Sequence, residues 1–184
     1  MNTQRGFTLV ELLYSVGIAA LVLGVGVPSF IDQVRSSRMN AATNTLLSAL
    51  YVGRSEAVKQ RRRVTVCRST ISDAPACSSE GTGYAVFVNV DDDSSFDAGA
   101  GDVLLRNDVW LRGTITTIAD GLPIYVSYVS SGFTRAIGGG AQSGDIIFCD
   151  ERGNTGARIL RLPATGRPQI VAHDEVPGAP TCAT

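Results

Sequence analysis

The sequence lacks the residue types and spacings on which most enzyme and metal sites are built. It has a single histidine, His173, and four cysteines, none of which forms a CxxC pair. That histidine is not spaced with any two cysteines as a zinc site requires. A serine elbow, a zinc-binding helix motif and a phosphate-binding loop are also missing. We therefore predict a protein that is not an enzyme.

The chain also has little net charge. Its 184 residues contain 16 Lys and Arg against 17 Asp and Glu, a formal charge of −1. Without a leader that contains Arg5, the balance is 15 against 17, or −2. No general electrostatic attraction to nucleic acid follows from this balance. The length suits one domain of ordinary size beyond a long helix.

A long apolar run near the N-terminus is the strongest local signal. Residues 7–27 contain one ionisable side chain, Glu11, and Arg5 is the only charge before them. About 20 apolar residues span the hydrocarbon core of a bilayer, and the position of Arg5 predicts a cytoplasmic leader with the rest of the chain outside. An unpaired carboxylate in such a span costs several kcal/mol, so Glu11 needs a partner. A cleaved signal peptide and a plain anchor are alternatives, although residues 25–29 resemble a signal cleavage site poorly.

Residues 6–13, Gly-Phe-Thr-Leu-Val-Glu-Leu-Leu, resemble the class III leader of type IV pilins and type II secretion pseudopilins. The resemblance implies that a prepilin peptidase cuts after Gly6 and N-methylates Phe7. Cleavage creates a cationic amine at Phe7, and Glu11 can pair with it in the same helix or in a neighbouring subunit. Either pairing neutralises a charge that lipid would penalise.

The resemblance also implies a pilin-like plan in the α+β class, in which a long N-terminal helix packs on an antiparallel β head. We expect a leader at 1–6, a membrane-spanning and filament-core half-helix at 7–28, an amphipathic helix at 29–60 and a periplasmic or extracellular head at 61–184. Pro28 is expected to kink the helix and not to end it. The buried stripe of the second half is formed by Phe30, Val34, Met39, Ala42, Leu46, Leu50 and Ala57, widened by Leu47, Tyr51 and Val58.

In the head, β-branched and alternating runs predict antiparallel strands separated by loops rich in Gly, Asp and Ser. The predicted strands are residues 64–68, 84–90, 103–106, 110–118, 124–128, 146–150, 159–162 and 169–172. The motifs Ser55-Glu56-Ala57 and Cys67-Arg68-Ser69 are similar to the helix-to-strand signature of the GspH/FimT group of minor pilins and pseudopilins.

The four cysteines are expected to form disulfides, because the N-terminal segment places them outside the cytosol. Four cysteines allow three connectivities. We favour Cys67 with Cys77, which closes a short polar loop, and Cys149 with Cys182, which ties the C-terminal tail to a strand. Relatives in the family are often bridged in a similar way.

Two groups of basic residues could contact DNA phosphates. The first, at the end of the helix, contains Lys59, Arg61, Arg62, Arg63 and Arg68, although the helix dipole favours cations there in any case. The second is Gly166-Arg167-Pro168-Gln169, which resembles the G-R-x-R motif of DNA-binding FimT proteins, with Gln169 in place of the second arginine. Arg158 and Arg161 would act with Arg167. The alternative is a simple turn before the last strand.

The acidic segment 91–102 is a weak candidate for calcium. Asp91, Asp93, Asp97 and Asp102 fall at calcium-loop positions, but Phe96 replaces the usual glycine and the closing residue is not glutamate. A solvated acidic loop is the alternative. No other cofactor is predicted.

We therefore predict a minor pilin or pseudopilin that is inserted in the bacterial inner membrane and then assembled into a type IV pilus, in its tip or initiation complex. The expected partners are other minor and major pilins and the prepilin peptidase. The alternatives are a DNA-binding tip pilin for natural transformation and a type II secretion pseudopilin of the GspH kind.

Overall fold

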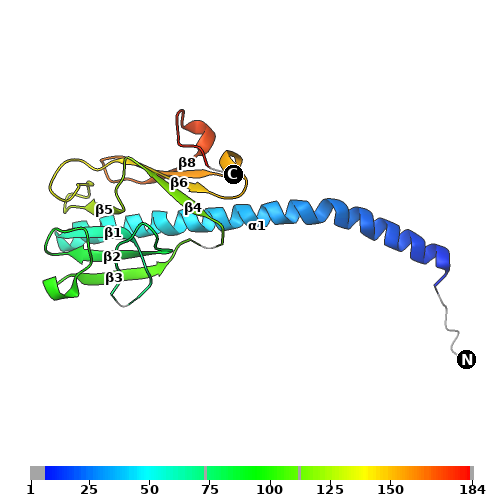
Figure 1. Ribbon diagram of the computed structural model, residues 1–184, viewed down its shortest axis with the longest axis horizontal. Coiled ribbons are helices and arrows are strands. Elements are labelled where there is room, and N and C mark those ends of the chain that lie inside the picture. Colours follow the sequence, from blue (N-terminus) through cyan, green and yellow to red (C-terminus); the bar gives the residue numbers. More distant parts are fainter. Residues whose placement is uncertain (1–6, 73, 112, 183–184) are drawn as a thin grey trace, which may run out of the picture. The chain divides into compact units, whose positions relative to one another are not determined.

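The computed structural model describes residues 7–72, 74–111 and 113–182 (Figure 1). The chain forms two compact units, residues 1–37 and 38–184. The predicted leader, with the cleavage position after Gly6, lies outside the described residues. Each unit is described by itself below.

A single helix, α1 (Leu9–Gln60), supplies the described part of the first unit and the beginning of the second. The Thr8 hydroxyl accepts a hydrogen bond from the Glu11 N–H at 3.3 Å, so Thr8 caps the helix and the helix begins at Leu9 and not at Phe7 as predicted. The helix continues through Pro28. It ends at the predicted residue, because Arg61 adopts a left-handed backbone conformation with φ of 53°.

The second half of α1 provides one wall of the main core. Met39, Leu46, Leu50 and Ala57 of the predicted stripe are buried. Phe30 is 70% exposed in the first unit, and Tyr51 and Val58 are about half exposed, so the stripe is narrower than predicted. Burial of the stripe against β-sheets accounts for the position of this half-helix in the head.

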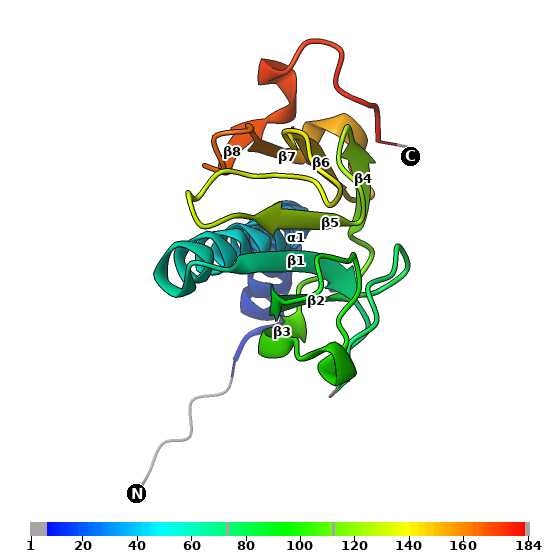
Figure 2. The same cartoon turned by 90° about the vertical axis from the view of Figure 1, so that its left-hand side faces the viewer.

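Two antiparallel sheets of four strands pack on this half of the helix. Sheet A has the order β3-β2-β1-β5 and sheet B the order β4-β6-β7-β8, and Figure 2 shows the strands in that succession. The strand bounds are β1 Arg63–Ser69, β2 Gly83–Asn89, β3 Val103–Val109, β4 Thr116–Asp120, β5 Tyr125–Tyr128, β6 Gly144–Cys149, β7 Arg158–Leu162 and β8 Gln169–Ala172. Short 3-10 turns lie at Ala98–Ala100, Gly153–Thr155 and His173–Glu175.

The predicted strand at 110–118 is wrong over its first half. Trp110, Leu111 and Ile115 are buried, but they belong to a connecting segment whose Gly113 has φ of 73°. A left-handed residue interrupts an extended strand, and burial alone does not separate a core strand from a buried connection. The strand in this region is the shorter β4.

Smaller apolar clusters cover the outer face of each sheet, and each contains a disulfide. Cys67 is bonded to Cys77 beside Phe87 and Phe96 on sheet A. Cys149 is bonded to Cys182 beside Ile147 and Ile159 on sheet B. These are the two pairs favoured in the sequence analysis. They hold a loop and the C-terminal tail over apolar side chains that would otherwise meet water.

Candidate functional site

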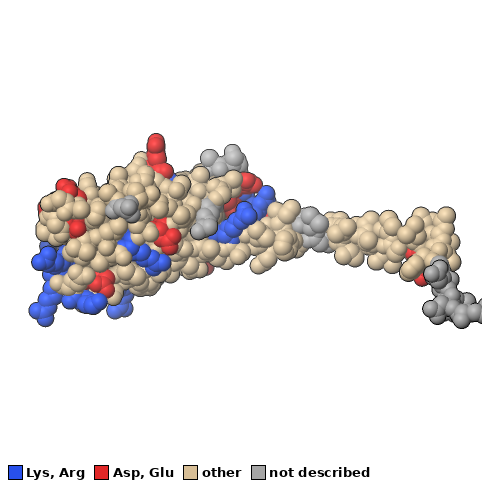
Figure 3. Space-filling view, turned by 90° about the horizontal axis from the view of Figure 1, so that it is seen from below, with Lys and Arg blue, Asp and Glu red and all other residues tan. Residues whose placement is uncertain are grey.

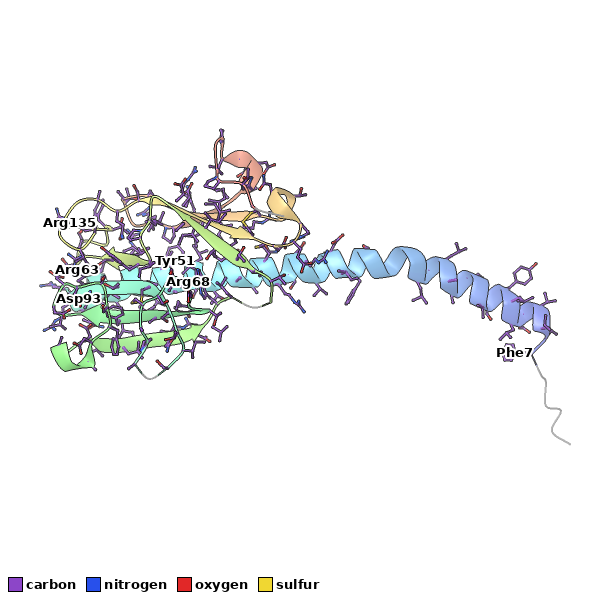
Figure 4. The ribbon with its side chains drawn as sticks, viewed as in Figure 1. Phe7, Tyr51, Arg63, Arg68, Asp93 and Arg135 are labelled. Atoms are coloured by element: carbon purple, nitrogen blue, oxygen red, sulfur yellow. A yellow bond between two sulfur atoms is a disulfide. The ribbon has the colours of Figure 1, made fainter. Side chains whose placement is uncertain are left out.

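The first candidate site is the apolar surface of α1 between Leu9 and Leu23. Its large apolar side chains are 58–75% exposed and cover all sides of the helix. Phe7, just before the helix, is 85% exposed and is labelled in Figure 4. In the part of the chain that is described, α1 is the one helix long and apolar enough to cross a membrane by length and composition. A continuous apolar surface of this kind needs a lipid or protein environment.

Polar groups within this surface are mostly satisfied by the helix itself. The Ser15 hydroxyl donates to the Leu12 carbonyl at 2.9 Å, and Thr8 caps the first turn. Glu11 is different, because its carboxylate forms no ion pair with any described residue. Its place in the first turn is favourable to the helix dipole. The site can therefore accept a cation brought by another group.

The second candidate site is the basic cluster at the end of α1, where Figure 3 shows Lys and Arg side chains gathered at one end of the head. Lys59 lies 3.2 Å from Glu56. Hydrogen bonds from Gln60 and Lys59 lower the pKa of Glu56. Arg61 and Arg62 are exposed. This part of the cluster is a solvated helix end with two cations available for contacts.

Arg63, predicted as part of the same cluster, has a different environment. Its side chain is 14% exposed and pairs with Asp92. Its Nη1 donates to the Ser127 hydroxyl and to the Arg135 carbonyl, both at 2.9 Å, and Figure 4 labels Arg63 near Arg135. These bonds connect β1 to β5 and to the loop after it, so the Arg63 side chain has a structural role.

The arginines of the predicted DNA motif do not share one surface. Arg161 pairs with Asp145 on the neighbouring strand at 3.0 and 2.8 Å, and these contacts raise the pKa of Arg161. Arg158 and Arg161 are three residues apart on β7, so alternation sends them to opposite faces of sheet B. Arg167 is exposed and makes no ion pair with the described residues.

The turn that carries Arg167 has a structural role of its own. Gly166 has φ of 72°, and a Cβ there would lie 2.3 Å from the Gly132 carbonyl oxygen. The Tyr51 hydroxyl of α1 donates to the Pro168 carbonyl at 3.1 Å. The glycine and proline of the motif are therefore explained by close packing of the turn against the loop at Gly132 and against the helix.

The acidic segment does not bring together the carboxylates that were the weak candidates for calcium. The Asp93 carboxylate accepts from the Ser95 N–H, and the Asp97 carboxylate accepts from the Gly99 N–H, both at 2.7 Å. Asp102 accepts from Val90 and Asp97 N–H groups. Because these carboxylates are used in turns, no group of three or more metal ligands comes together among the described residues.

Sequence reasoning missed two polar side chains that organise the head. Gln142 is 4% exposed and bonds to the backbone of β5 through both ends of its amide. Arg68 reaches from β1 to the Gly81 carbonyl and to the Thr117 hydroxyl of β4. Nothing in the sequence marks a single glutamine in a glycine-rich loop as structurally important. Arg68 was noted in the sequence only as a member of the basic cluster, and its contacts with Gly81 and Thr117 were not predicted.

Comparison with known proteins identifies the family and several relatives. Residues 42–166, more than half of the chain, match the family described as type II transport protein GspH, and residues 1–27 match the prokaryotic N-terminal methylation motif. The type IV major pilin protein PilA of Myxococcus xanthus is 30% identical over 70% of this chain and 60% of its own length. The prepilin peptidase-dependent protein D of Escherichia coli is 34% identical over 26% of this chain and 32% of its own length.

The chain thus spans less than two thirds of either curated relative. Among solved structures, two crystal forms of the type IV minor pilin FimU of Pseudomonas aeruginosa match with TM-scores of 0.57 and 0.55. They are 22% and 21% identical, cover 77% and 76% of this chain and are themselves covered to 94% and 97%. At that identity the likeness establishes the fold.

Proposed function

This chain belongs to the GspH family of pilin-like type II transport proteins, and we propose that it is a minor subunit that assembles through α1 into a type IV pilus, in the tip or the initiation complex. The observation that carries the proposal is the exposed apolar surface of α1 with one carboxylate, Glu11, inside it. Before assembly this surface would contact the hydrocarbon of the inner membrane. In the filament, helices of neighbouring pilins would replace the lipid.

Glu11 would set the position of one subunit relative to the next. Cleavage after Gly6 would leave a cationic amine at Phe7, and an ion pair between that amine and Glu11 of a neighbour would remove an uncompensated charge from the apolar filament core. Breaking such a buried pair costs about 3–5 kcal/mol. A shift of one subunit along the filament axis would separate the two charges, so the pairing would favour one axial register.

Family membership implies processing by the prepilin peptidase and assembly with other pilins. We further propose that the unassembled protein crosses the inner membrane once, with residues 61–184 in the periplasm. The disulfides of the head suit that compartment. Mass spectrometry of the mature protein should find an N-methylated Phe7 as the first residue. An intact Met1, or cleavage beyond Val27, would remove the processing argument.

Deletion of the gene, followed by separate assays of piliation, protein secretion and DNA uptake, tests which machine the subunit serves. Loss of piliation that is restored by the wild-type chain supports the proposal. Complementation with Glu11→Gln should leave the protein in the membrane but reduce its amount in sheared filaments. Ser48→Ala, an exposed change on the same helix outside the apolar surface, is the matched control.

A type II secretion pseudopilin is the second candidate, and the description of the matched family favours it. Loss of secretion with normal piliation would select this function over the pilus. Normal piliation with lost transformation would instead favour a DNA-binding tip subunit. In that case Arg167→Ala should weaken DNA retention and reduce its salt dependence, although Arg161 and Arg63 are each already paired with an aspartate.

A further inference from the structure

The two sheets of the head meet along a seam that is closed at one end. The edge strand of sheet A at this seam is β5 and that of sheet B is β4, whereas β3 and β8 form the opposite edges. The side-chain amide of Gln142 makes the hydrogen bonds that a neighbouring strand would make with β5. Its Oε1 accepts from the Ser127 N–H and its Nε2 donates to the Tyr125 carbonyl, both at 2.9 Å. The Arg135 N–H bonds to the Ser127 carbonyl. These contacts seal that end of the seam with backbone-like hydrogen bonds.

The other end of the seam is hollow. A cavity of about 250 Å³ lies between β1 and β5 on one side and β4 and β6 on the other. Leu46 and Leu50 of α1 form its floor with Trp110, whereas the exposed side chains of Ala119 and Ile124 stand at its mouth. An apolar cavity of about 150 Å³ is large enough to bind benzene. This cavity therefore has room for a compact apolar molecule with a polar end.

One cation that lines this cavity, Arg68, has no ionic partner among the described residues. Trp110 is 5% exposed and lines the cavity, and its Nε1 has no hydrogen-bond partner among the described residues. Arg68, also a lining residue, bonds to two neutral oxygens, those of Gly81 and Thr117, and forms no ion pair within the described part of the chain. Figure 4 labels Arg68 along β1 from Arg63.

The electrostatics of Arg68 favour an anionic guest. Burial lowers the pKa of the Arg68 guanidinium, since desolvation disfavours the charged form, while the negative charge of exposed Glu80 acts in the opposite direction. Glu80 is not in ion-pair contact with it. A partly desolvated arginine whose acceptors are all neutral is stabilised most by a carboxylate. The two carboxylate oxygens can accept two parallel, charge-assisted hydrogen bonds from the guanidinium.

We propose that this cavity is a binding site for a small apolar carboxylate, whose apolar body would lie against Trp110 and the α1 leucines and whose carboxylate would pair with Arg68. The inference is independent of the filament role, because every residue that carries it lies in the second unit, residues 38–184, and none in the apolar surface between Leu9 and Leu23. A partner subunit's apolar side chain is a different occupant, and a cavity built for it would not bind an acid more tightly than the neutral amide.

The chain offers a direct readout, because Trp110 is its one tryptophan. The full-length protein in a detergent without aromatic groups is titrated with phenylacetate, and Trp110 fluorescence is recorded. The neutral phenylacetamide serves as the matched probe. We expect a saturable change with phenylacetate at about millimolar concentration, the range for a ligand of this size, and at least about tenfold weaker binding of the amide.

Variants separate the parts of the site. Arg68→Gln should weaken phenylacetate binding at least about tenfold and leave phenylacetamide binding unchanged. Ala119→Phe, at an exposed strand position, should block the mouth and abolish binding of both probes. Arg62→Gln, an exposed charge change just after the end of α1, should leave both unchanged. Circular dichroism and thermal unfolding establish that each variant is folded.

The proposal is overturned if the wild-type chain shows no saturable response to phenylacetate. It is also overturned if Ala119→Phe binds as the wild type does, because the probe would then lie elsewhere. Equal binding of acid and amide by the wild type would refute the role of Arg68 and with it the carboxylate class. None of these outcomes bears on pilus assembly, so failure here is distinguishable from failure of the proposed function.

Discussion

Gln142 offers a sharp test of how the head is held together. Its amide makes two hydrogen bonds with β5, to Ser127 and Tyr125, and the side chain is 4% exposed. Replacement by alanine removes both bonds but leaves the backbone bond from the Thr134 hydroxyl to the residue 142 carbonyl. The variant therefore isolates the side-chain contribution to the edge of sheet A.

The expected cost follows from the groups that are left behind. A buried donor or acceptor without a partner costs about 1–3 kcal/mol. Ser127 is fully buried and its N–H should carry a full penalty, whereas Tyr125 is only partly buried and water can reach its carbonyl. We expect Gln142→Ala to lower the free energy of unfolding by about 2–4 kcal/mol.

Urea unfolding of the full-length chain, followed by Trp110 fluorescence, measures this loss. Gln169→Ala is the matched control, because Gln169 is exposed on β8 and should change stability by less than about 0.5 kcal/mol. Gln142→Glu should also destabilise, since a carboxylate cannot donate to the Tyr125 carbonyl. A loss below about 1 kcal/mol in Gln142→Ala would show that water replaces the amide and would refute the reasoning.

Three further predictions concern stability. Loop entropy predicts that loss of the 149–182 disulfide, with a sequence separation of 33, lowers the free energy of unfolding by about 3.7 kcal/mol. Loss of the 67–77 disulfide, with a separation of 10, should lower it by about 2.7 kcal/mol. Urea unfolding of the two double-alanine variants measures both losses, and a larger loss for the 67–77 variant would contradict this. Gly166→Ala should cost about 2 kcal/mol more than Gly139→Ala, because both positions have positive φ but only the first would bring a Cβ against a carbonyl oxygen. The Tyr128 hydroxyl is buried without a described partner, so Tyr128→Phe should leave stability at pH 7 unchanged or slightly higher. Burial raises the pKa of Tyr128, so the unfolded chain loses this proton first and stability should fall as the pH rises above about 10; a fall equally steep in Tyr128→Phe would exclude Tyr128 as its source.

The long helix and the β character of the head were predictable because both rest on local signals. The apolar run of residues 7–27 and the three- and four-residue spacing of apolar side chains in residues 30–57 are each patterns within one short stretch of sequence. Thr8 and Glu11 have the spacing of a helix cap, a pattern that would have placed the start at Leu9. The error at 110–118 arose because Trp110 and Ile115 are as buried as strand residues without being in a strand.

The candidate sites in the head were not predictable in the same way. The pairing of β1 with β5 joins residues about 60 positions apart, as in the register of Thr65 with Ser127. Nothing local specifies that β5 ends sheet A, that Gln142 covers its edge, or that a cavity opens beside Trp110. These features depend on strand order, which is decided by long-range packing and not by the pattern within any one segment.

The basic residues show how folding redistributes a charge cluster. In sequence, Arg61, Arg62, Arg63 and Arg68 form one positive group, but strand alternation separates the last two. Arg63 lies on the face of Thr65 and pairs with Asp92, whereas Arg68 lies on the face of Val66 and lines the cavity. Only Arg61 and Arg62 of these four stay exposed. Because each phosphate contact contributes a salt-sensitive increment and the whole chain carries a charge of −1, two exposed arginines and Arg167 give at most weak attraction to a polyanion. The partly buried Arg63 is therefore used inside the head, and the exposed apolar surface of α1 remains the larger feature that needs a partner.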